Sequence, residues 1–141
     1  MLKPDARERA ALLVRAACLP DMPRARTLLA EEPELARFDF YTACVTGEAD
    51  AVAAFLATDS TLATRKGGPD DREPILYACF SRFLRTDARR AAGSERIARM
   101  LLKHGADANS HYVVEADGCS FIQTPLFGAA GIANNAALTR M

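Results

Sequence analysis

Tryptophan is absent from this 141-residue sequence, and no two cysteines form a C-x-x-C pair. The missing pair excludes the usual spacing of a zinc finger or of a dithiol redox motif. Cys18, Cys44 and Cys79 lie instead within apolar helical patterns, and Cys119 lies apart from them near the C-terminal end. We therefore expect free, mostly buried thiols in a protein from a reducing compartment.

Long apolar runs are also missing, because no stretch approaches the length that crosses a bilayer. The N-terminal segment mixes acidic and basic residues ahead of its apolar run and lacks a signal-peptide cleavage pattern. These two absences predict a cytoplasmic protein that does not insert into a membrane.

Net charge is the third absence, since 18 Lys and Arg residues balance 18 Asp and Glu residues. A neutral chain has no overall attraction for nucleic acid or for anionic lipid, so any such binding must come from a local basic cluster. Half of the residues are apolar. That proportion is enough for one domain to form a core without disulfides or a structural metal.

The clearest pattern in the sequence is residues 96–109, RIARMLLKHGADAN. Ile97, Met100 and Leu101 recur at helical spacing, which predicts an amphipathic helix with one buried side. Gly105 is the expected left-handed residue that ends this helix. Further on, TPLFGAA at 124–130 is typical of a helix start, with Thr124 as the N-cap and Leu126 pointing inward.

Aligning the rest of the chain on these two motifs divides it into four helix-turn-helix units. Gly47 and Gly93 are expected at the turns inside the second and third units. The approximate bounds of the units, which together form one domain over 1–141, are 5–37, 38–72, 73–120 and 121–141.

The fourth unit is incomplete in this interpretation, with 133–135 as its turn and only the first turn or two of its second helix. A helix that short is marginal by itself. We expect the last six residues to be frayed or held by a neighbouring chain, and an open apolar end of this unit would allow two copies to form a dimer.

GADAN at 105–109, TPL at 124–126 and Gly93 resemble the ankyrin repeat, in the divergent style of bacterial members. Leu76 and Phe127 depart from the family pattern, because both stand where the family usually has histidine. The resemblance implies an all-α solenoid of stacked helix pairs with hairpin-like loops. It also implies a non-catalytic scaffold that binds a protein partner, unidentified here, on a concave face. The candidates on that face are Tyr41, Thr42, Tyr77 and Phe80.

The connection at 110–123 is longer than an ankyrin linker, and Asp117-Gly118 between two β-prone arms predicts a hairpin. Tyr112, Val114 and Phe121 on this finger are the candidate partner-binding residues, since exposed aromatics are typical of interface hot spots. The alternative is that the apolar residues of the finger fold back onto the helices as a local core, namely Val113, Val114, Phe121 and Ile122.

A basic segment covers residues 82–103, and its candidate patch consists of Arg82, Arg85, Arg89 and Arg90. Such a cluster could attract an acidic partner or bind phosphate. The alternative is a solvated helix face. Nucleic-acid binding is unlikely on this sequence, because no stacking aromatic other than Phe83 lies among the arginines.

His104, His111, Asp117 and Cys119 are close in sequence and suggest a Cys-His nucleophile or a zinc site. The suggestion is weak, because nothing in the sequence forms an oxyanion hole or a phosphate loop. We expect no catalytic residues, no metal and no cofactor.

Overall fold

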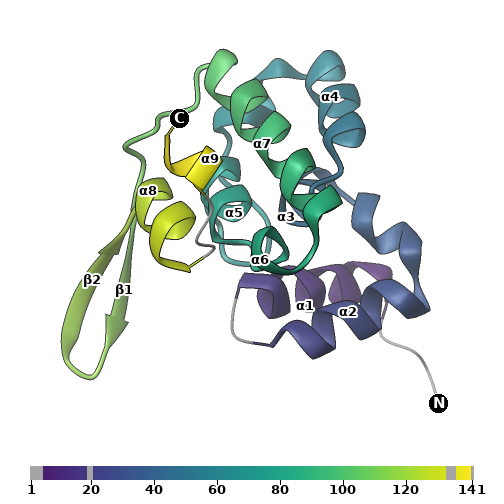
Figure 1. Cartoon of the computed structure of the whole chain (residues 1–141), viewed down its shortest axis with the longest axis horizontal. Coiled ribbons are helices and arrows are strands. Elements are labelled where there is room, and N and C mark those ends of the chain that lie inside the picture. Colours follow the sequence, from purple (N-terminus) through teal and green to yellow (C-terminus); the bar gives the residue numbers. More distant parts are fainter. Residues whose placement is uncertain (1–4, 19–20, 133–135, 141) are drawn as a thin grey trace.

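The structure is a computed structural model that describes residues 5–18, 21–132 and 136–140. It is mostly helical and has one small two-stranded sheet near its C-terminal end (Figure 1). The expected predominance of helix is therefore confirmed. Every helix in the described part of the chain is too short or too polar to cross a membrane.

The longer helices pack in sequential pairs. The pairs are α1 (Ala6–Cys18) with α2 (Met22–Glu31), α3 (Phe40–Thr46) with α4 (Ala49–Thr58), and α5 (Pro74–Phe80) with α7 (Ala88–Lys103). The short elements between them are η1 (Pro33–Arg37), η2 (Ser60–Thr64) and α6 (Phe83–Thr86). The last helical elements are α8 (Pro125–Phe127), η3 (Gly128–Ile132) and α9 (Ala136–Thr139).

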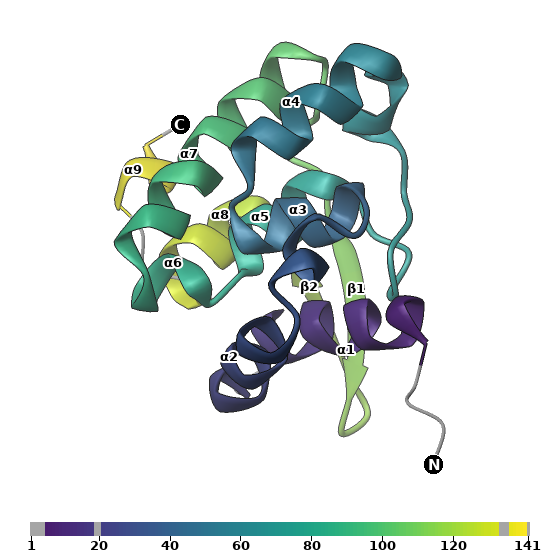
Figure 2. The same ribbon diagram turned by 90° about the vertical axis from the view of Figure 1, so that its right-hand side faces the viewer.

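The pairs also contact one another in order (Figure 2). The first helices form one row, in which α1 contacts α3, α3 contacts α5, and α5 contacts α8 and η3. In the second row α4 contacts α7, and α7 contacts α9. The main core lies between these rows and includes Cys44, Val52, Ile97 and Leu101, all of which are fully buried. Burying such side chains is the main source of the stability of the stack.

Gly47 occupies the predicted turn, because its φ of 76° ends α3 in the left-handed conformation. The prediction for Gly93 is wrong, since this residue lies inside α7. The second helix of the third unit begins earlier, at Asp87, whose side chain accepts a hydrogen bond from the Arg90 amide at 3.1 Å. Gly93 is needed instead for close packing: a Cβ atom there would lie 1.9 Å from the Gly47 carbonyl oxygen.

The end of α7 matches the prediction from residues 96–109. Gly105 has a φ of 98°, and its amide donates to the Leu102 carbonyl at 3.1 Å. The Ala106 amide donates to the Leu101 carbonyl at 2.9 Å. These two bonds form a Schellman motif, which satisfies carbonyl groups at the helix end.

The start of α8 is confirmed in part. Thr124 accepts a hydrogen bond from the Phe127 amide at 3.2 Å, as an N-cap does, but Leu126 is 58% exposed. The inward orientation predicted for Leu126 is wrong, because the buried residue of this turn is Pro125.

The expectation that the last six residues are frayed or held by another chain is wrong for the described residues 136–140. Ala136–Thr139 form α9, which packs against α7 and η3 of the same chain, and Leu138 is buried in the main core. The predicted turn at 133–135 lies outside the described residues, as does residue 141.

Candidate functional site

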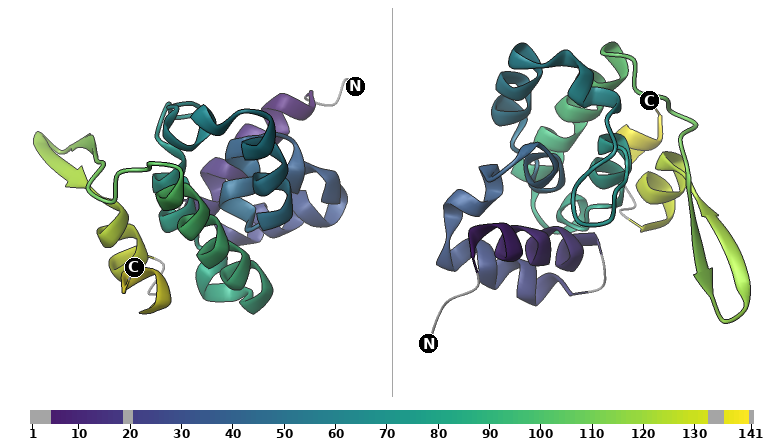
Figure 3. Two further views of the ribbon diagram at one scale, coloured as in Figure 1. Left: turned by 90° about the horizontal axis from the view of Figure 1, so that it is seen from above. Right: turned by 180° about the vertical axis from the view of Figure 1, so that it is seen from behind.

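The predicted finger is a β-hairpin. Its strands are β1 (Tyr112–Ala116) and β2 (Cys119–Gln123), paired antiparallel through a two-residue turn. Asp117 and Gly118 have φ values of 51° and 75°, so both adopt the left-handed conformation that a type I′ hairpin turn requires. The hairpin projects away from the helices, with its tip free of them (Figures 1 and 3).

The register of the hairpin divides its side chains between two faces, because residues directly opposite each other point to the same side. Tyr112 pairs with Gln123 and Val114 pairs with Phe121, and we call their side the cleft face. Val113 pairs with Ile122 on the other side, which we call the open face. All three predicted finger residues therefore share the cleft face.

A cavity of about 390 Å³ lies between the cleft face and the helices, and we call it the hairpin cleft. It is lined from α1, from the loop before α5, from the end of α5 and from the hairpin. The lining residues are Arg15, Cys18, Asp70, Arg72, Phe80, Arg82, Tyr112, Val114 and Gln123. The structure thus brings together Phe80, Arg82, Tyr112 and Val114, which the sequence analysis placed in three separate groups.

Tyr112 joins the hairpin to the helices. Its ring lies against Phe80, with 5.8 Å between the centroids, and the guanidinium carbon of Arg72 lies 3.6 Å from its centroid. Its hydroxyl donates to the side-chain oxygen of Gln123 on the opposite strand. Partial burial raises the pKa of the Tyr112 hydroxyl, and the nearby Arg72 charge acts in the opposite direction. These contacts fix the base of the finger.

The cleft carries an excess of positive charge. Arg15, Arg72 and Arg82 line it, and Asp70 is the one acidic residue among the described residues of its lining. Arg15 already engages Asp70 at 3.3 Å and also donates to the Pro69 carbonyl at 3.0 Å. Arg82 is held through its backbone, whose amide donates to the Ala17 carbonyl at 2.9 Å. Its side-chain Nε is buried and has no hydrogen-bond partner among the described residues.

Cys18 also lines the hairpin cleft. Burial raises the pKa of its thiol to about 12, while Arg72 and Arg82 act in the opposite direction. The thiol is therefore protonated at neutral pH, and this form is a poor nucleophile and a poor metal ligand. Within the described residues, no three His, Cys, Asp or Glu side chains are grouped closely enough to hold a metal ion.

Exposed apolar side chains concentrate on the hairpin and on α8. Among the described residues, five of the six large hydrophobic side chains that are exposed lie on the hairpin or on α8. We call these five the apolar patch: Val113, Phe121, Ile122, Leu126 and Phe127, with exposed fractions between 47% and 67%. The alternative in which the finger folds back as a local core is wrong for Val113, Phe121 and Ile122.

The prediction that Tyr77 and Phe80 offer exposed side chains to a partner on a concave face is wrong, since these residues are 1% and 4% exposed. The Tyr77 hydroxyl donates to the Gly67 carbonyl at 2.7 Å and accepts from the Asp70 amide at 3.1 Å, so it holds the loop before α5. Burial raises the pKa of Tyr77 to about 12. Thr42 is also buried.

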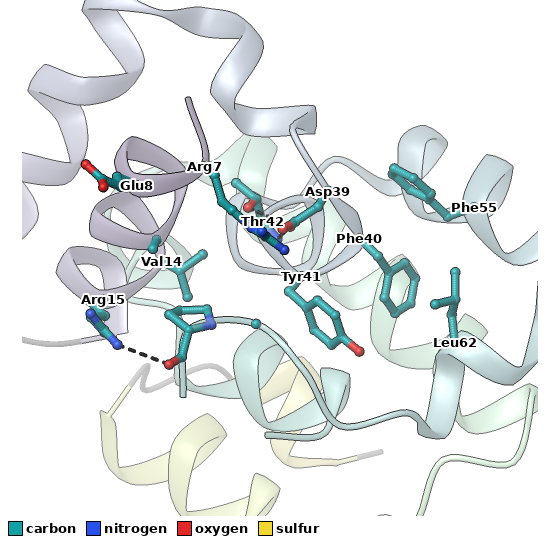
Figure 4. Close-up of a pocket in the computed structure, with 13 residues that line it drawn as sticks. Arg7, Glu8, Val14, Arg15, Asp39, Phe40, Tyr41, Thr42, Phe55 and Leu62 are labelled. Carbon is teal, nitrogen blue, oxygen red and sulfur yellow. Dashed lines mark hydrogen bonds between the residues drawn. The ribbon is translucent and has the colours of Figure 1, made fainter. Parts of the chain in front are cut away.

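Tyr41 lines a second, larger hollow of about 630 Å³ between α1, α3 and η2. Figure 4 shows its ring beside that of Phe40, and the two ring centroids are 5.6 Å apart. Its hydroxyl donates to the Arg65 carbonyl at 2.7 Å. The walls of this hollow are mainly apolar, and Arg15, which donates to the Pro69 carbonyl at 3.0 Å, lines both this hollow and the hairpin cleft.

The predicted basic patch is divided in the structure. Arg82 lines the hairpin cleft and, together with Arg85, a second hollow beside Met22 and Pro23. Arg90 donates to the Thr46 carbonyl at 2.8 Å and forms ion pairs with Glu48 and Asp87. Arg85 and Arg89 are exposed. The four arginines therefore do not act as one surface, and Arg90 serves the packing of α7 against α3.

Arg15 and Arg72 are the two arginines of the cleft that were not predicted from the sequence. They come from the end of α1 and from the loop before α5, far from each other and from the hairpin in sequence. No local pattern marks either residue, since each stands in an ordinary polar position. No family model matches the chain, and neither does any curated protein or solved structure at a significant level.

Proposed function

We propose that this chain is a divergent ankyrin-type repeat module that binds a partner protein through the hairpin and the hairpin cleft. The observation that carries the proposal is the apolar patch, which gathers nearly all of the large exposed hydrophobic side chains at one end of the molecule. Single exposed apolar residues are ordinary, but several on two neighbouring elements are typical of a protein-binding surface.

The hairpin suits this role because it is already ordered. Its turn conformation, its paired strands and the packing of Tyr112 between Arg72 and Phe80 fix its position before any partner arrives. Binding to a preformed element loses little conformational entropy, so more of the contact energy remains as affinity.

The order of packing supports the ankyrin-type part of the proposal. Helix pairs follow one another along the chain, with first helices against first helices and second helices against second helices. Stacked repeats of this kind contact mainly their neighbours and leave loops along one side for binding. The hairpin at 112–123 follows the second helix of the third pair, where a projecting finger is expected in such a stack.

A non-catalytic role is favoured by the chemistry of the cleft. The Cys18 thiol is protonated, and among the described residues that line the cleft the arginines have no nucleophile or general base beside them apart from Asp70, which Arg15 engages. An arrangement of this kind can bind and orient a charged group, but it has no group poised to transfer a proton.

Self-association is the second candidate, and the exposed Leu126 and Phe127 of α8 favour it. They extend the apolar patch from the hairpin onto the C-terminal end of the stack, so two copies could bury this surface against each other. Light scattering at micromolar concentration separates the two candidate functions. A monomeric chain would contradict self-association, and the binding of a different protein would then be the remaining candidate.

The test of partner binding is affinity capture from lysate of the native organism with three matched baits. The first is the parent chain, the second carries Phe121→Ser and Ile122→Ser, and the third carries Phe38→Ser. Phe38 is the exposed large hydrophobic residue outside the apolar patch. We expect a partner that is retained by the parent and by Phe38→Ser and lost by the hairpin variant. Equal capture by all three baits would reject the hairpin as the binding site.

A further inference from the structure

We propose that the hairpin cleft binds an oxyanion, a carboxylate or phosphate group carried by an acidic segment of the partner. The identity of the carrier rests on the proposed function, whereas the anion site rests on the cleft itself. Arg15, Arg72 and Arg82 line the cleft, and Asp70 is the only acidic side chain that lines it in the part of the chain that the structure describes.

The charge in the cleft is not neutralised from within. Asp70 is engaged by Arg15, at 3.3 Å, on the side of the loop that faces α1. Arg72 and Arg82 have no ion pair with any described residue, so two positive charges are left at one cavity. Partly buried like charges repel each other, and a bound anion would relieve that repulsion.

Arg82 supplies the second, independent observation. Its Nε is buried and has no hydrogen-bond partner among the described residues. A buried donor without an acceptor is unfavourable, and native proteins pair such groups with protein, water or a ligand. The backbone bond from Arg82 to Ala17 fixes the position from which this side chain starts.

Arg72 is prepared for the same ligand. Its guanidinium stacks on the Tyr112 ring with 3.6 Å between the guanidinium carbon and the ring centroid. Stacking uses the flat face of the guanidinium and leaves N–H groups in its plane, which match the oxygen spacing of a carboxylate or a phosphate. An arginine held in this way loses little side-chain entropy when an anion binds.

The walls of the cleft indicate the rest of the ligand. Val114 lines the cavity, and its direct cross-strand partner Phe121 lies beside it on the same face of the hairpin. A partner segment that carries an acidic residue next to an apolar one therefore matches the cleft, because the cleft offers arginines beside an apolar wall. The cavity of about 390 Å³ is in the range of small-ligand sites and accommodates one such side chain.

The test is an NMR titration of the ¹⁵N-labelled full chain, following the arginine Nε–H signals and the backbone amides. The probes are two short acetylated peptides of the same length, each with a leucine after the central residue, which is glutamate in one and phosphoserine in the other. A third peptide with glutamine at the centre is the neutral control. We expect saturable shifts of the Arg82 Nε–H signal with at least one anionic peptide and none with the glutamine peptide.

Four variants locate the site. Arg82→Gln and Arg72→Gln should each lower the affinity for the anionic peptide at least tenfold. Arg82→Lys should lower this affinity by a smaller factor, because lysine keeps the charge but lacks the planar guanidinium. Arg89→Gln is the control, since it removes the same charge from an exposed position outside the cleft. The backbone spectrum of each variant verifies its fold.

The outcomes are distinct. Saturable binding that is lost in the cleft variants and kept in Arg89→Gln supports the site, and the tighter peptide identifies the carboxylate or the phosphate as the natural group. If Arg89→Gln weakens peptide binding as much as the cleft variants do, the proposed site is wrong and the binding reflects unspecific charge. The same conclusion follows if a 12-base-pair DNA duplex shifts the same signals as strongly as the peptides do. Absence of saturation with both anionic peptides would overturn the proposed site too, and the hairpin capture experiment would still decide the proposed function.

Discussion

The guanidinium carbon of Arg72 lies 3.6 Å from the centroid of the Tyr112 ring, and this contact joins the loop before α5 to the base of the hairpin. The two residues are forty positions apart in the printed sequence. Because the same ring also packs against Phe80, one side chain connects the hairpin, the loop and a first helix. The position of the finger relative to the stack depends on this junction.

Replacing Arg72 with alanine should loosen the hairpin. A cation over an aromatic face that is partly shielded from water contributes about 1 kcal/mol, so amides of β1 should exchange roughly fivefold faster. Hydrogen exchange measured by NMR tests this expectation. Tyr112→Phe is the matched control, since it keeps the ring under Arg72 and removes only the hydroxyl that donates to Gln123. Unchanged exchange in Arg72→Ala would show that the junction does not hold the hairpin.

Gly93→Ala should destabilise the chain although alanine is the better helix former. The new Cβ would lie 1.9 Å from the Gly47 carbonyl oxygen, so α7 must shift away from the turn of the second pair. We expect a loss of about 2–3 kcal/mol in the free energy of unfolding, measured by urea denaturation. Ala92→Gly, at an exposed position of the same helix, should cost only about 1 kcal/mol. A more stable Gly93→Ala variant would contradict this packing.

Asp87→Ala should weaken the start of α7. The Asp87 carboxylate accepts a hydrogen bond from the Arg90 amide at 3.1 Å and lies 3.6 Å from the Arg90 side chain. Losing an N-cap costs about 1 kcal/mol, which thermal unfolding resolves in a chain of this size. Asp87→Asn keeps an acceptor for the amide and should recover most of the loss. Equal losses in both variants would assign the effect to charge rather than to the cap.

Stability should fall in alkaline solution because of the buried thiols. Burial raises the pKa of Cys79 from 9.0 to about 12 and raises the pKa of Cys44 as well. In the unfolded chain these thiols lose their protons near pH 9, whereas in the folded chain they keep them, so the free energy of unfolding decreases as the pH rises from about 9 to 12. Each thiol should lower the free energy of unfolding by about 2 kcal/mol at pH 10.5.

Urea denaturation at pH 7.5, 9 and 10.5 measures this loss. Cys79→Ala is less stable at neutral pH because it removes a buried side chain, but its stability should depend less on pH than that of the parent. Cys119→Ala is the control, since it removes a thiol from an exposed position. A parent whose stability is constant up to pH 10.5 would contradict the burial of these thiols.

The sequence by itself determined those features that depend on a few neighbouring residues. Gly105 ends α7, Asp117-Gly118 forms the hairpin turn and Thr124 caps α8, because left-handed backbone and capping hydrogen bonds require nothing beyond the local chain. The amphipathic helix with Ile97 and Leu101 was equally predictable, since its apolar spacing already indicates the side that must be buried.

Only the tertiary structure decided how these elements use their side chains. Gly93 has the properties of a turn glycine, but the contact of α7 with Gly47 places it inside a helix. Leu126 points outward and Tyr77 inward because the neighbouring helices, not the local spacing, decide which side is covered. The hairpin cleft is the strongest case. Its charge comes from positions 15, 72 and 82, which no local pattern connects, and only the packing of α1, the loop and the hairpin brings them to one cavity.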